Sequence, residues 1–337
     1  MASPGRGMAE PIISVRNLSI RYRTRDGVTY AVDDASFDLE RGKVLTLVGE
    51  SGCGKSTAGM AIMRLLPQAA DVLSGNVLFD GIDLLALGEQ ELRRMRGRRI
   101  AMIFQDPVAG LNPVLDIGTQ VGEILVSHLG IGKKEARQRA VEILHEVGLA
   151  EPGRVARSYP FQLSGGMCQR VMIGIATALD PDVIIADEPT SALDVTVQAQ
   201  ILHQIDELRR RKGTAVLLIT HDFGVVAQMA DEVAVMYAGR VVESGSVQDM
   251  LRSPLHPYTH ALLATLPRVD GKHGHLRQIP GHPPEMGERA ERCPFIPRCG
   301  KVMNVCRNTE PPGLMQPERA THRVACYNPI WQGQAEG

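Results

Sequence analysis

Two short glycine-rich segments, more than a hundred residues apart, constrain most strongly what this chain can fold into. The first, Gly49–Ser56, follows the apolar run Val44–Val48 and precedes a predicted helix over Thr57–Leu66. Its glycines let backbone N–H groups turn inward around phosphate oxygens, and the helix N-terminus adds a favourable dipole. Strand, glycine loop and helix in this order predict a nucleotide site, in which Lys55 neutralises the β- and γ-phosphates and Ser56 binds Mg²⁺.

The second glycine segment, Leu163–Arg170, predicts a different kind of anion site. Ser164 is a suitable N-cap for a helix over Met167–Leu179, and a helix N-terminus attracts anions. The segment has no lysine and no acidic partner of its own, so it does not make an independent Mg²⁺-nucleotide site. Either the chain folds both loops onto one nucleotide, or each loop supplies half of a site that another chain completes.

Polar side chains follow three of the predicted buried strands. Asp187 and Glu188 end the apolar strand Val183–Ala186; we expect Asp187 to hold Mg²⁺ and Glu188 to act as general base on the attacking water. His221 follows another apolar strand and faces the crevice where open parallel sheets bind ligands, in reach of a γ-phosphate. Gln105 also follows a strand, where it could sense Mg²⁺ or the attacking water.

Strands and helices alternate along most of the chain, which predicts an α/β fold with a largely parallel core sheet. Further predicted strands are Ile12–Arg23, Val28–Leu39, Ser74–Phe79, Ala215–Ile219 and the hairpin Val233–Tyr237 with Arg240–Glu243; further predicted helices are Gly118–Leu129, Lys134–Val147 and Val195–Arg211. After about Leu266, proline, histidine, arginine and cysteine increase and periodicity fades. We therefore expect a disordered lead-in over 1–11, a main domain over 12–266 and a loop-rich extension over 267–337.

Composition excludes some classes of function. A net charge of −1 and an aromatic content of 4% argue against a nucleic-acid partner. No apolar run approaches the about 18–20 residues that span a bilayer, and the first residues lack the apolar core of a signal peptide. These features predict a cytosolic protein, or one peripheral to the cytosolic face of a membrane.

Four of the six cysteines gather near the C-terminus: Cys293, Cys299, Cys306 and Cys326. They are separated by five, six and nineteen residues, and in a cytosolic chain such a cluster favours a metal over disulfides. A stretch so poor in large apolar residues also needs a cross-link, such as a bound metal centre, to fold. Spacing alone leaves both tetrahedral zinc and an iron–sulfur cluster open, with reduced thiols as the alternative and His322 as an outside candidate ligand.

Taken together, these segments resemble the ATP-binding cassette (ABC) family from about 12 to 266. Gly49–Ser56 is similar to its Walker A loop, Gln105 to its Q-loop, Leu163–Gln169 to its signature motif, Val183–Glu188 to its Walker B strand, Ser191–Asp194 to its D-loop and His221 to its switch histidine. The resemblance implies a P-loop NTPase fold with a mixed-sheet RecA-like core, an antiparallel β subdomain and a helical subdomain at about 110–178. Cys168 departs from the family, which usually has a basic residue there.

The same resemblance implies a nucleotide site made by two chains arranged head to tail. One chain supplies the contacts around ATP and its Mg²⁺, and Tyr22 matches the aromatic that stacks on adenine, with Tyr30 as the alternative. The implied nucleotide-binding residues of that loop are Gly49, Glu50, Ser51, Gly52, Cys53, Gly54, Lys55, Ser56 and Thr57. The other chain's signature motif faces the γ-phosphate, and the residues implied to bind nucleotide there are Ser164, Gly165, Gly166 and Gln169, together with Asp194 of the D-loop.

Within the family, the chain resembles the ATPase subunits of peptide/nickel-type importers. The similar stretches are Gly49–Gly52, Phe104–Pro107, Leu111–Val114, Tyr159–Gln162 (with Phe161 in place of the usual histidine), His256–Thr259 and the cysteine-bearing extension. Some members carry a 4Fe–4S cluster in that extension, so the resemblance favours this cluster over zinc.

The function implied is ATP hydrolysis that drives import of di- or oligopeptides into a bacterium. The implied partners are a second ATPase subunit, which we expect to be a paralogue, two membrane permease subunits and an extracytoplasmic substrate-binding protein. The chain would then lie at the cytoplasmic face of the inner membrane as a peripheral subunit. Nickel or another small solute, and a non-transport ABC ATPase, stay open as alternatives; the signature segment argues against a P-loop kinase.

Overall fold

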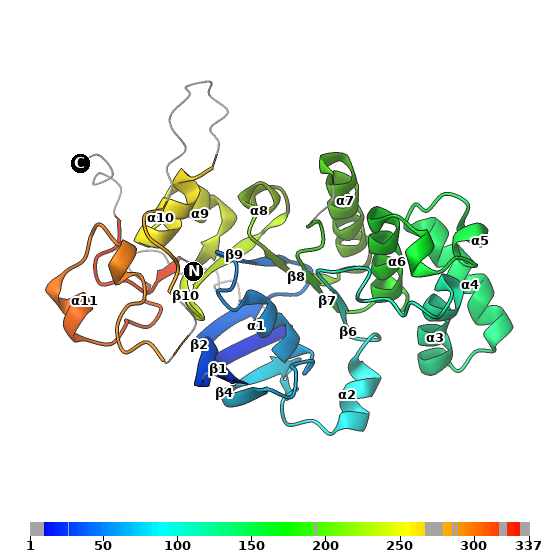
Figure 1. Cartoon of the computed structure of the whole chain (residues 1–337), viewed down its shortest axis with the longest axis horizontal. Coiled ribbons are helices and arrows are strands. Elements are labelled where there is room, and N and C mark those ends of the chain that lie inside the picture. Colours follow the sequence, from blue (N-terminus) through cyan, green and yellow to red (C-terminus); the bar gives the residue numbers. More distant parts are fainter. Residues whose placement is uncertain are drawn as a thin grey trace, which may run out of the picture.

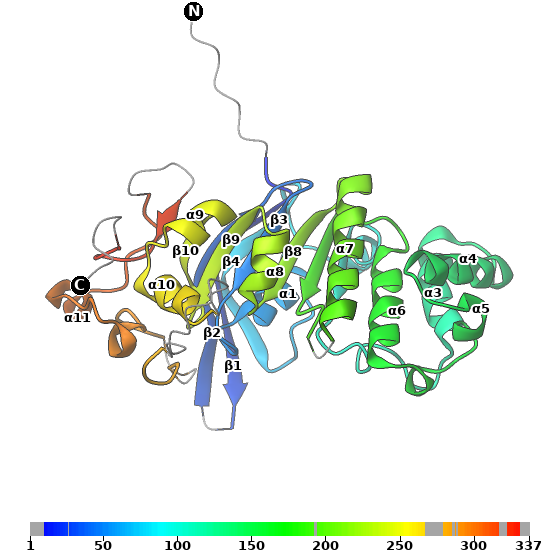
Figure 2. The same cartoon turned by 90° about the horizontal axis from the view of Figure 1, so that it is seen from above.

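The computed structural model describes residues 10–25, 27–191, 194–266, 279–284, 287, 289–316 and 322–330. The predicted lead-in, apart from residues 10 and 11, and the predicted boundary at 267 lie outside this part of the chain. Figures 1 and 2 show a central sheet with helices α7 (Val195–Lys212) and α8 (Phe223–Met229) on one face, a helical lobe at one end and the C-terminal extension at the other.

The central sheet has seven strands in the order β11-β10-β9-β3-β8-β7-β6. Five of them run parallel: β9 (Glu232–Tyr237), β3 (Val44–Val48), β8 (Ala215–Thr220), β7 (Val183–Asp187) and β6 (Ile100–Ile103). Strands β10 (Arg240–Ser246) and β11 (Arg323–Val324) extend one edge of this sheet with antiparallel pairing. The predicted α/β fold is therefore correct, and the carboxyl ends of β3, β6, β7 and β8 meet at one edge of the sheet.

The apolar strands are buried on both faces, as parallel strands between two layers require. Successive residues of β7 alternate between the layers: Ile185 packs in the cluster around α1 (Lys55–Ile62), whereas Ile184 packs with the helical lobe. This alternation explains why the strand reads as a continuous apolar run in the sequence.

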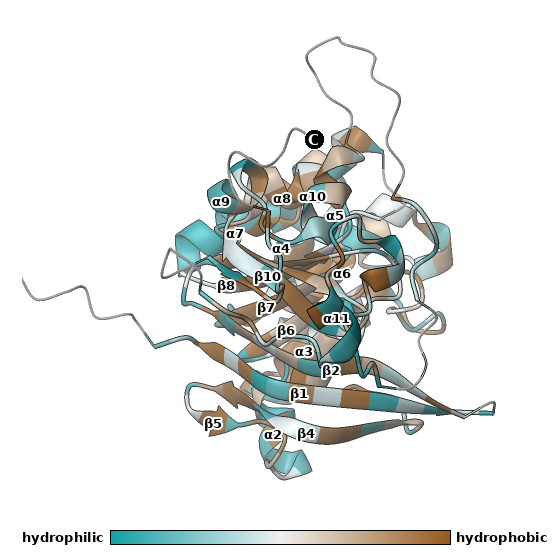
Figure 3. Cartoon of the chain, turned by 90° about the vertical axis from the view of Figure 1, so that its left-hand side faces the viewer, coloured by the Kyte–Doolittle hydropathy of each residue, from teal (hydrophilic) through white to brown (hydrophobic). Residues whose placement is uncertain are grey.

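A second, four-stranded antiparallel sheet lies beside α1, in the order β2-β1-β4-β5. Its strands are β2 (Gly27–Leu39), β1 (Ile13–Thr24), β4 (Ala70–Phe79) and β5 (Ile82–Asp83). Hydrophobic and hydrophilic residues alternate along β1 (Figure 3), because one face of this sheet covers the core and the other does not. Ile20 and Leu47 share one apolar cluster, which joins the two sheets through α1.

The helical lobe consists of α3 (Ile117–Leu129), α4 (Lys133–Glu146), α5 (Pro152–Val155) and α6 (Gly165–Thr177). Asp116 caps α3 by accepting a hydrogen bond from the Thr119 N–H, and Gly130 ends the helix in a left-handed conformation. Helix α2 (Glu89–Met95) lies apart from this lobe, beside the antiparallel sheet. These helices lie within the region of about 110–178 that the sequence assigns to a helical subdomain, except for α2.

The extension packs against the side of the central sheet formed by β9, β10 and β11. Phe295 forms edge-on ring contacts with Tyr237 of β9, at 5.2 Å, and with Tyr258 of α10 (Pro257–Ala264), at 5.5 Å. The other short elements here are α9 (Val247–Arg252), η2 (Ile296–Arg298) and α11 (Asn304–Asn308). Among the described residues, no helix has the length and apolarity to cross a membrane.

The element bounds differ from the prediction mainly at helix ends and in short helices. Helix α1 stops at Ile62, not Leu66, because Arg64 turns to a left-handed φ of 49° before Pro67. The sequence does not predict helices α2, α5 and α8 to α11, nor the pairing of the extension with the central sheet through β11.

Candidate nucleotide site

The phosphate loop, Gly49–Ser56, leaves the end of β3 and leads into α1. Two of its glycines have no room for a side chain. A Cβ at Gly49 would lie 2.2 Å from the Met236 carbonyl oxygen, and one at Gly54 would lie 2.1 Å from the Ala31 carbonyl oxygen. Gly54 also has a φ of 102°, so the loop passes between neighbouring backbones where only glycine fits.

Lys55 folds back over this loop. Its Nζ donates hydrogen bonds to the carbonyl oxygens of Gly49, at 2.8 Å, and Glu50, at 2.9 Å, and the residue is 5% exposed. It also approaches the Cys53 sulfur at 3.6 Å. Burial raises the pKa of the Cys53 thiol, although the nearby ammonium opposes the shift, so Cys53 is an uncharged part of the loop.

Ser56 and Asp187 face each other across the ends of β7 and α1. The Ser56 Oγ donates to Asp187 Oδ1 at 2.9 Å, and Asp187 is 5% exposed. Burial raises the pKa of Asp187, the hydrogen bond from Ser56 opposes this, and the charge of Glu188 reinforces it. A hydroxyl and a carboxylate oxygen at this distance are the hard ligands that Mg²⁺ prefers.

Glu188 lies at the centre of a second group of polar side chains. One carboxylate oxygen accepts from Gln105 Nε2 at 2.9 Å, and the other lies 3.0 Å from His221 Nδ1. An ionised carboxylate only accepts hydrogen bonds, so Nδ1 carries the proton. The Glu188 backbone has a φ of 44°, an uncommon conformation held by its N–H bond to the Ile219 carbonyl oxygen. Residues following β6, β7 and β8 thus meet at one point.

The signature segment begins α6 at a different part of the surface. The Ser164 hydroxyl accepts from the Met167 N–H at 3.3 Å, as the N-cap prediction requires. Ser164 and Gly165 are exposed, and Gly166 is partly exposed. Gln169 is 2% exposed and lies on the buried side of the helix, so this conformation does not present it to a ligand together with Ser164.

Cys168 is a buried residue of the helical lobe. It has no exposed surface, its thiol donates to the Pro160 carbonyl oxygen at 3.6 Å, and burial raises its pKa. A charged side chain could not stay buried at this position without a large free-energy cost. The uncharged cysteine therefore suits the local packing better than the basic residue that is usual in the family it resembles. Beyond the signature, Asp194 caps α7 through the N–H groups of Thr196 and Val197, while residues 192 and 193 of the predicted D-loop lie outside the described residues.

Tyr22 lies close to the phosphate loop. Its hydroxyl is 3.3 Å from the Thr57 hydroxyl, which links β1 to the first turn of α1. Tyr30 lies on β2, where its N–H donates to the Gly287 carbonyl oxygen of the extension. Adenine stacking by Tyr22 stays a prediction.

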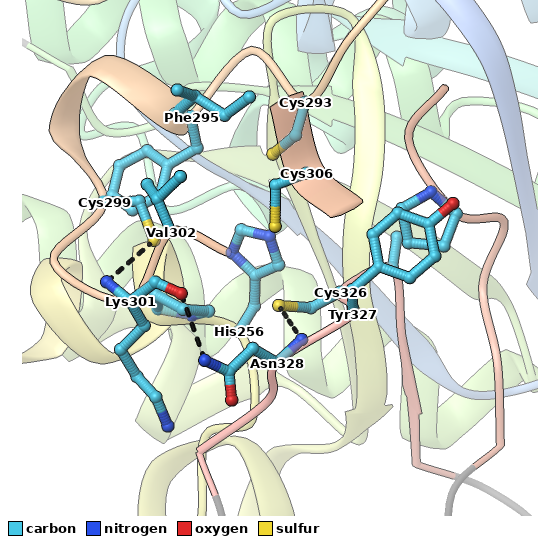
Figure 4. Close-up of a pocket in the computed structure, with 14 residues that line it drawn as sticks. His256, Cys293, Phe295, Cys299, Lys301, Val302, Cys306, Cys326, Tyr327 and Asn328 are labelled. Atoms are coloured by element: carbon cyan, nitrogen blue, oxygen red, sulfur yellow. Dashed lines mark hydrogen bonds between the residues drawn. The ribbon is translucent and has the colours of Figure 1, made fainter. Parts of the chain in front are cut away.

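The four C-terminal cysteines, all free thiols, line one small cavity together with His256 (Figure 4). Burial raises the pKa of Cys293 and Cys299, and that of Cys326 to about 11. In the part of the chain that the structure describes, no group of three or more His, Cys, Asp or Glu side chains is arranged to hold a metal ion. The predicted iron–sulfur or zinc site is therefore not supported by a formed ligand set.

His322 and His256 have different surroundings. His322, the outside candidate ligand, instead bonds Glu243 Oε1 through Nε2 at 2.8 Å. His256, which sequence reasoning did not select, lines the cavity, and its Nδ1 accepts from the Tyr258 N–H at 3.0 Å. Its burial lowers the pKa to about 4, so the ring is neutral.

Comparison with known proteins agrees with this geometry. The profile described as ABC transporter matches residues 32–191, and that described as oligopeptide/dipeptide transporter, C-terminal region, matches residues 242–306. The dipeptide transport ATP-binding protein DppD of Bacillus subtilis (strain 168) is 46% identical over 319 residues, which cover 94% of this chain and 95% of that protein. The chain belongs to the ABC transporter family.

Other relatives place the chain among the ATPase cassettes of that family. The oligopeptide transport ATP-binding protein OppD of Salmonella typhimurium is 43% identical over 96% of this chain and 95% of its own length. Among solved structures, the dimeric bacterial ABC transporter cassette MJ0796 has a TM-score of 0.63 and 31% identity, covering 70% of this chain and 98% of that chain. A post-hydrolysis state of that cassette, bound to ADP and Pi, has also been solved. The ABC ATPase prediction is therefore confirmed.

Proposed function

We propose that this cassette hydrolyses ATP to power import of di- or oligopeptides. The observation that carries the proposal is the convergence of two polar groups beside the phosphate loop: Ser56 with Asp187, and Glu188 with Gln105 and His221. In this proposal Lys55 neutralises the phosphates and Ser56 and Asp187 hold Mg²⁺. Glu188 takes a proton from the attacking water, while Gln105 and His221 fix its orientation.

We propose that two cassettes complete each nucleotide site. The exposed Ser164 and Gly165 begin a helix whose N-terminus suits an anion, but the segment lacks an Mg²⁺ ligand pair of its own. Its phosphate would then be supplied by a facing chain, as the dimeric form of the MJ0796 cassette suggests. Ser164, Gly165, Gly166 and the D-loop residue Asp194 are the proposed contacts across that interface; the buried Gln169 would support them from behind.

Peptide as the transported solute is supported by the names of the relatives and by the match of residues 242–306 to the oligopeptide/dipeptide transporter region. We propose 12–266 as the cassette and 267–337 as an extension of that type. The proposed partners are two membrane permease subunits, a second cassette and an extracytoplasmic substrate-binding protein. The chain would act as a peripheral subunit on the cytoplasmic side of the cell membrane.

The cysteine cavity is the proposed place for a 4Fe–4S cluster, with zinc as the alternative. Four sulfur donors around one cavity are the soft ligands that both centres take. Burial raises the pKa values of Cys293, Cys299 and Cys326 and so disfavours their free thiolates, a cost that a bound cation offsets. Among the described residues no ligand set for a metal ion is formed, so binding of a single zinc ion would require these side chains to rearrange.

The proposed function is tested by purifying the full chain from the membranes of the cells that produce it. We expect it to co-purify with hydrophobic permease subunits, and its ATPase rate in the reconstituted complex to rise when a peptide-loaded binding protein is added. If a nickel-loaded binding protein raises the ATPase rate and a peptide-loaded one does not, the transported solute is nickel and the peptide proposal is wrong. Stimulation by DNA or ribosomes, without permease subunits, would overturn the transport role.

A separate measurement tests the metal. Iron and acid-labile sulfide are assayed in anaerobically purified protein, together with visible absorption. We expect about four of each per chain. If the protein contains stoichiometric zinc and no iron, the site binds zinc and the proposal of a cluster is wrong.

A further inference from the structure

Arg298, in the C-terminal extension, reaches the phosphate loop. Its two terminal nitrogens donate to the two carboxylate oxygens of Glu50, at 2.7 and 2.8 Å. The Arg298 side chain is 3% exposed and that of Glu50 is 22% exposed. A two-pronged arginine–carboxylate contact away from water is both strong and geometrically specific.

The surroundings of Arg298 hold it in place independently of Glu50. Its Nε donates to the Pro280 carbonyl oxygen at 3.1 Å, and one terminal nitrogen lies 3.4 Å from the Tyr237 hydroxyl. It ends the short helix η2, directly before Cys299, which lines the cysteine cavity. Pro280 of the extension and Tyr237 at the end of β9 therefore hold the guanidinium in place.

Glu50 is held at three points. Its side chain bonds Arg298, its N–H donates to the Tyr258 hydroxyl at 2.9 Å, and its carbonyl accepts from Lys55 at 2.9 Å. Two of these three partners, Tyr258 and Arg298, come from the chain after β10, and only Lys55 belongs to the loop itself. The conformation of the phosphate loop thus depends on the C-terminal part of the chain.

We propose that Arg298 is a positioning residue of the nucleotide site, through which the extension sets the affinity of the cassette for ATP. Arg298 bonds the loop residue Glu50 and acts through it on the inward-facing amides. Loss of the guanidinium leaves the Glu50 carboxylate without its charged partner and lets the loop relax. This role goes beyond the proposed function, because it concerns ATP affinity and not the transported solute.

A second contact supports a link between the extension and the nucleotide site. The Gly287 carbonyl oxygen accepts from the Tyr30 N–H at 2.9 Å, and Arg289 pairs with Asp33 at 2.9 Å, both on β2. The extension therefore touches the phosphate loop and the antiparallel sheet that carries Tyr22 and Tyr30. A shift of the extension would reach both sides of the proposed ATP site.

The test compares Arg298→Met, Arg298→Lys, Glu50→Gln and the double variant Arg298→Met/Glu50→Gln in the full chain. The dissociation constant of Mg-ATP and the thermal unfolding midpoint are measured for each. We expect Arg298→Met to weaken ATP binding about tenfold, and Arg298→Lys to recover part of the loss. The double variant should bind no more weakly than Arg298→Met alone, because both changes remove the same link.

Arg209→Met is the matched control. Arg209 is likewise an arginine in carboxylate ion pairs, with Asp206 at 2.8 Å and Asp231 at 3.5 Å, and its side chain is 20% exposed, but it lies at the end of α7. We expect it to lower the unfolding midpoint with unchanged ATP affinity. The proposal is overturned if Arg298→Met behaves like this control, or if the effects of the two single changes on ATP affinity add. Should Arg298→Met fail to fold, Glu50→Gln decides alone: unchanged ATP affinity in that variant rejects the proposal.

Discussion

Replacing Glu188 by glutamine separates hydrolysis from nucleotide binding. Each Glu188 oxygen accepts one hydrogen bond, from Gln105 or from His221, and the side chain is 15% exposed. Glutamine has the same shape and keeps one acceptor oxygen, so the left-handed turn at this position should survive. It cannot accept a proton from water at neutral pH, and its NH₂ group faces one of the two donors.

The expected decrease in the hydrolysis rate follows from the loss of the general base alone. General-base catalysis contributes about 10²–10⁴-fold, or about 3–5 kcal/mol of transition-state stabilisation. The contacts expected to bind ATP, Lys55 and the Ser56–Asp187 pair, lie outside the change. We therefore expect the hydrolysis rate to fall by at least about a hundredfold with ATP affinity unchanged, and ATP to accumulate in a closed dimer.

Single-turnover hydrolysis, the ATP dissociation constant and size-exclusion chromatography with ATP give the three readouts. Glu232→Gln is the control, since it makes the same chemical change in a carboxylate that is 35% exposed and pairs with Lys43; it should leave all three unchanged. A rate within about fivefold of the parent protein for Glu188→Gln would refute its role as general base.

Three further changes test other parts of the site. Gly54→Ala should abolish ATP binding, because its Cβ would lie 2.1 Å from the Ala31 carbonyl oxygen, whereas Gly130→Ala at the end of α3, whose Cβ meets no described atom within 4 Å, should cost only about 1 kcal/mol of stability from its positive φ; equilibrium ATP binding and thermal unfolding distinguish them. Cys168→Lys should destabilise the chain by several kcal/mol, more than Cys168→Ala, in chemical denaturation, because position 168 is buried; equal effects would contradict this reason. Ser56→Ala should raise the Mg²⁺ concentration needed for half-maximal ATPase activity, measured by magnesium titration at fixed ATP; an unchanged requirement would remove Ser56 from the metal site.

The sequence predicts the central sheet and the polar groups at its edge well, because both depend on local pattern. Strand β3 has the predicted bounds, Val44–Val48, since four apolar residues around a single threonine suit a strand buried on both faces. Asp187 ends such a strand, Glu188 and His221 each follow one, and parallel strands bring their carboxyl ends together. Contact between Glu188 and His221 therefore follows from the topology and needs no further signal.

Contacts that join distant segments could not be predicted in the same way. Arg298 and Glu50 are 248 residues apart, and neither belongs to a periodic pattern that would reveal the other. The burial of Gln169 depends on the rotation of α6 within its lobe, which the glycine motif does not specify. The sequence marks His256 only as part of a stretch similar to the importer ATPases, whereas the structure places its imidazole beside four cysteines in the cavity of the proposed metal site (Figure 4).

The hydrogen bonds of Lys55 show why support from outside the loop matters for ATP binding. In the structure its ammonium group bonds the carbonyl oxygens of Gly49 and Glu50, and so helps to hold the loop closed. To neutralise phosphates, as a P-loop lysine does, it must turn part of its hydrogen bonding away from those carbonyls. The Glu50 backbone then depends more on the Tyr258 hydroxyl, and its side chain on Arg298. The nucleotide-bound loop should therefore rely on the extension more than the empty loop does, so removing Arg298 should reduce the stabilisation by ATP more than the stability of the nucleotide-free chain.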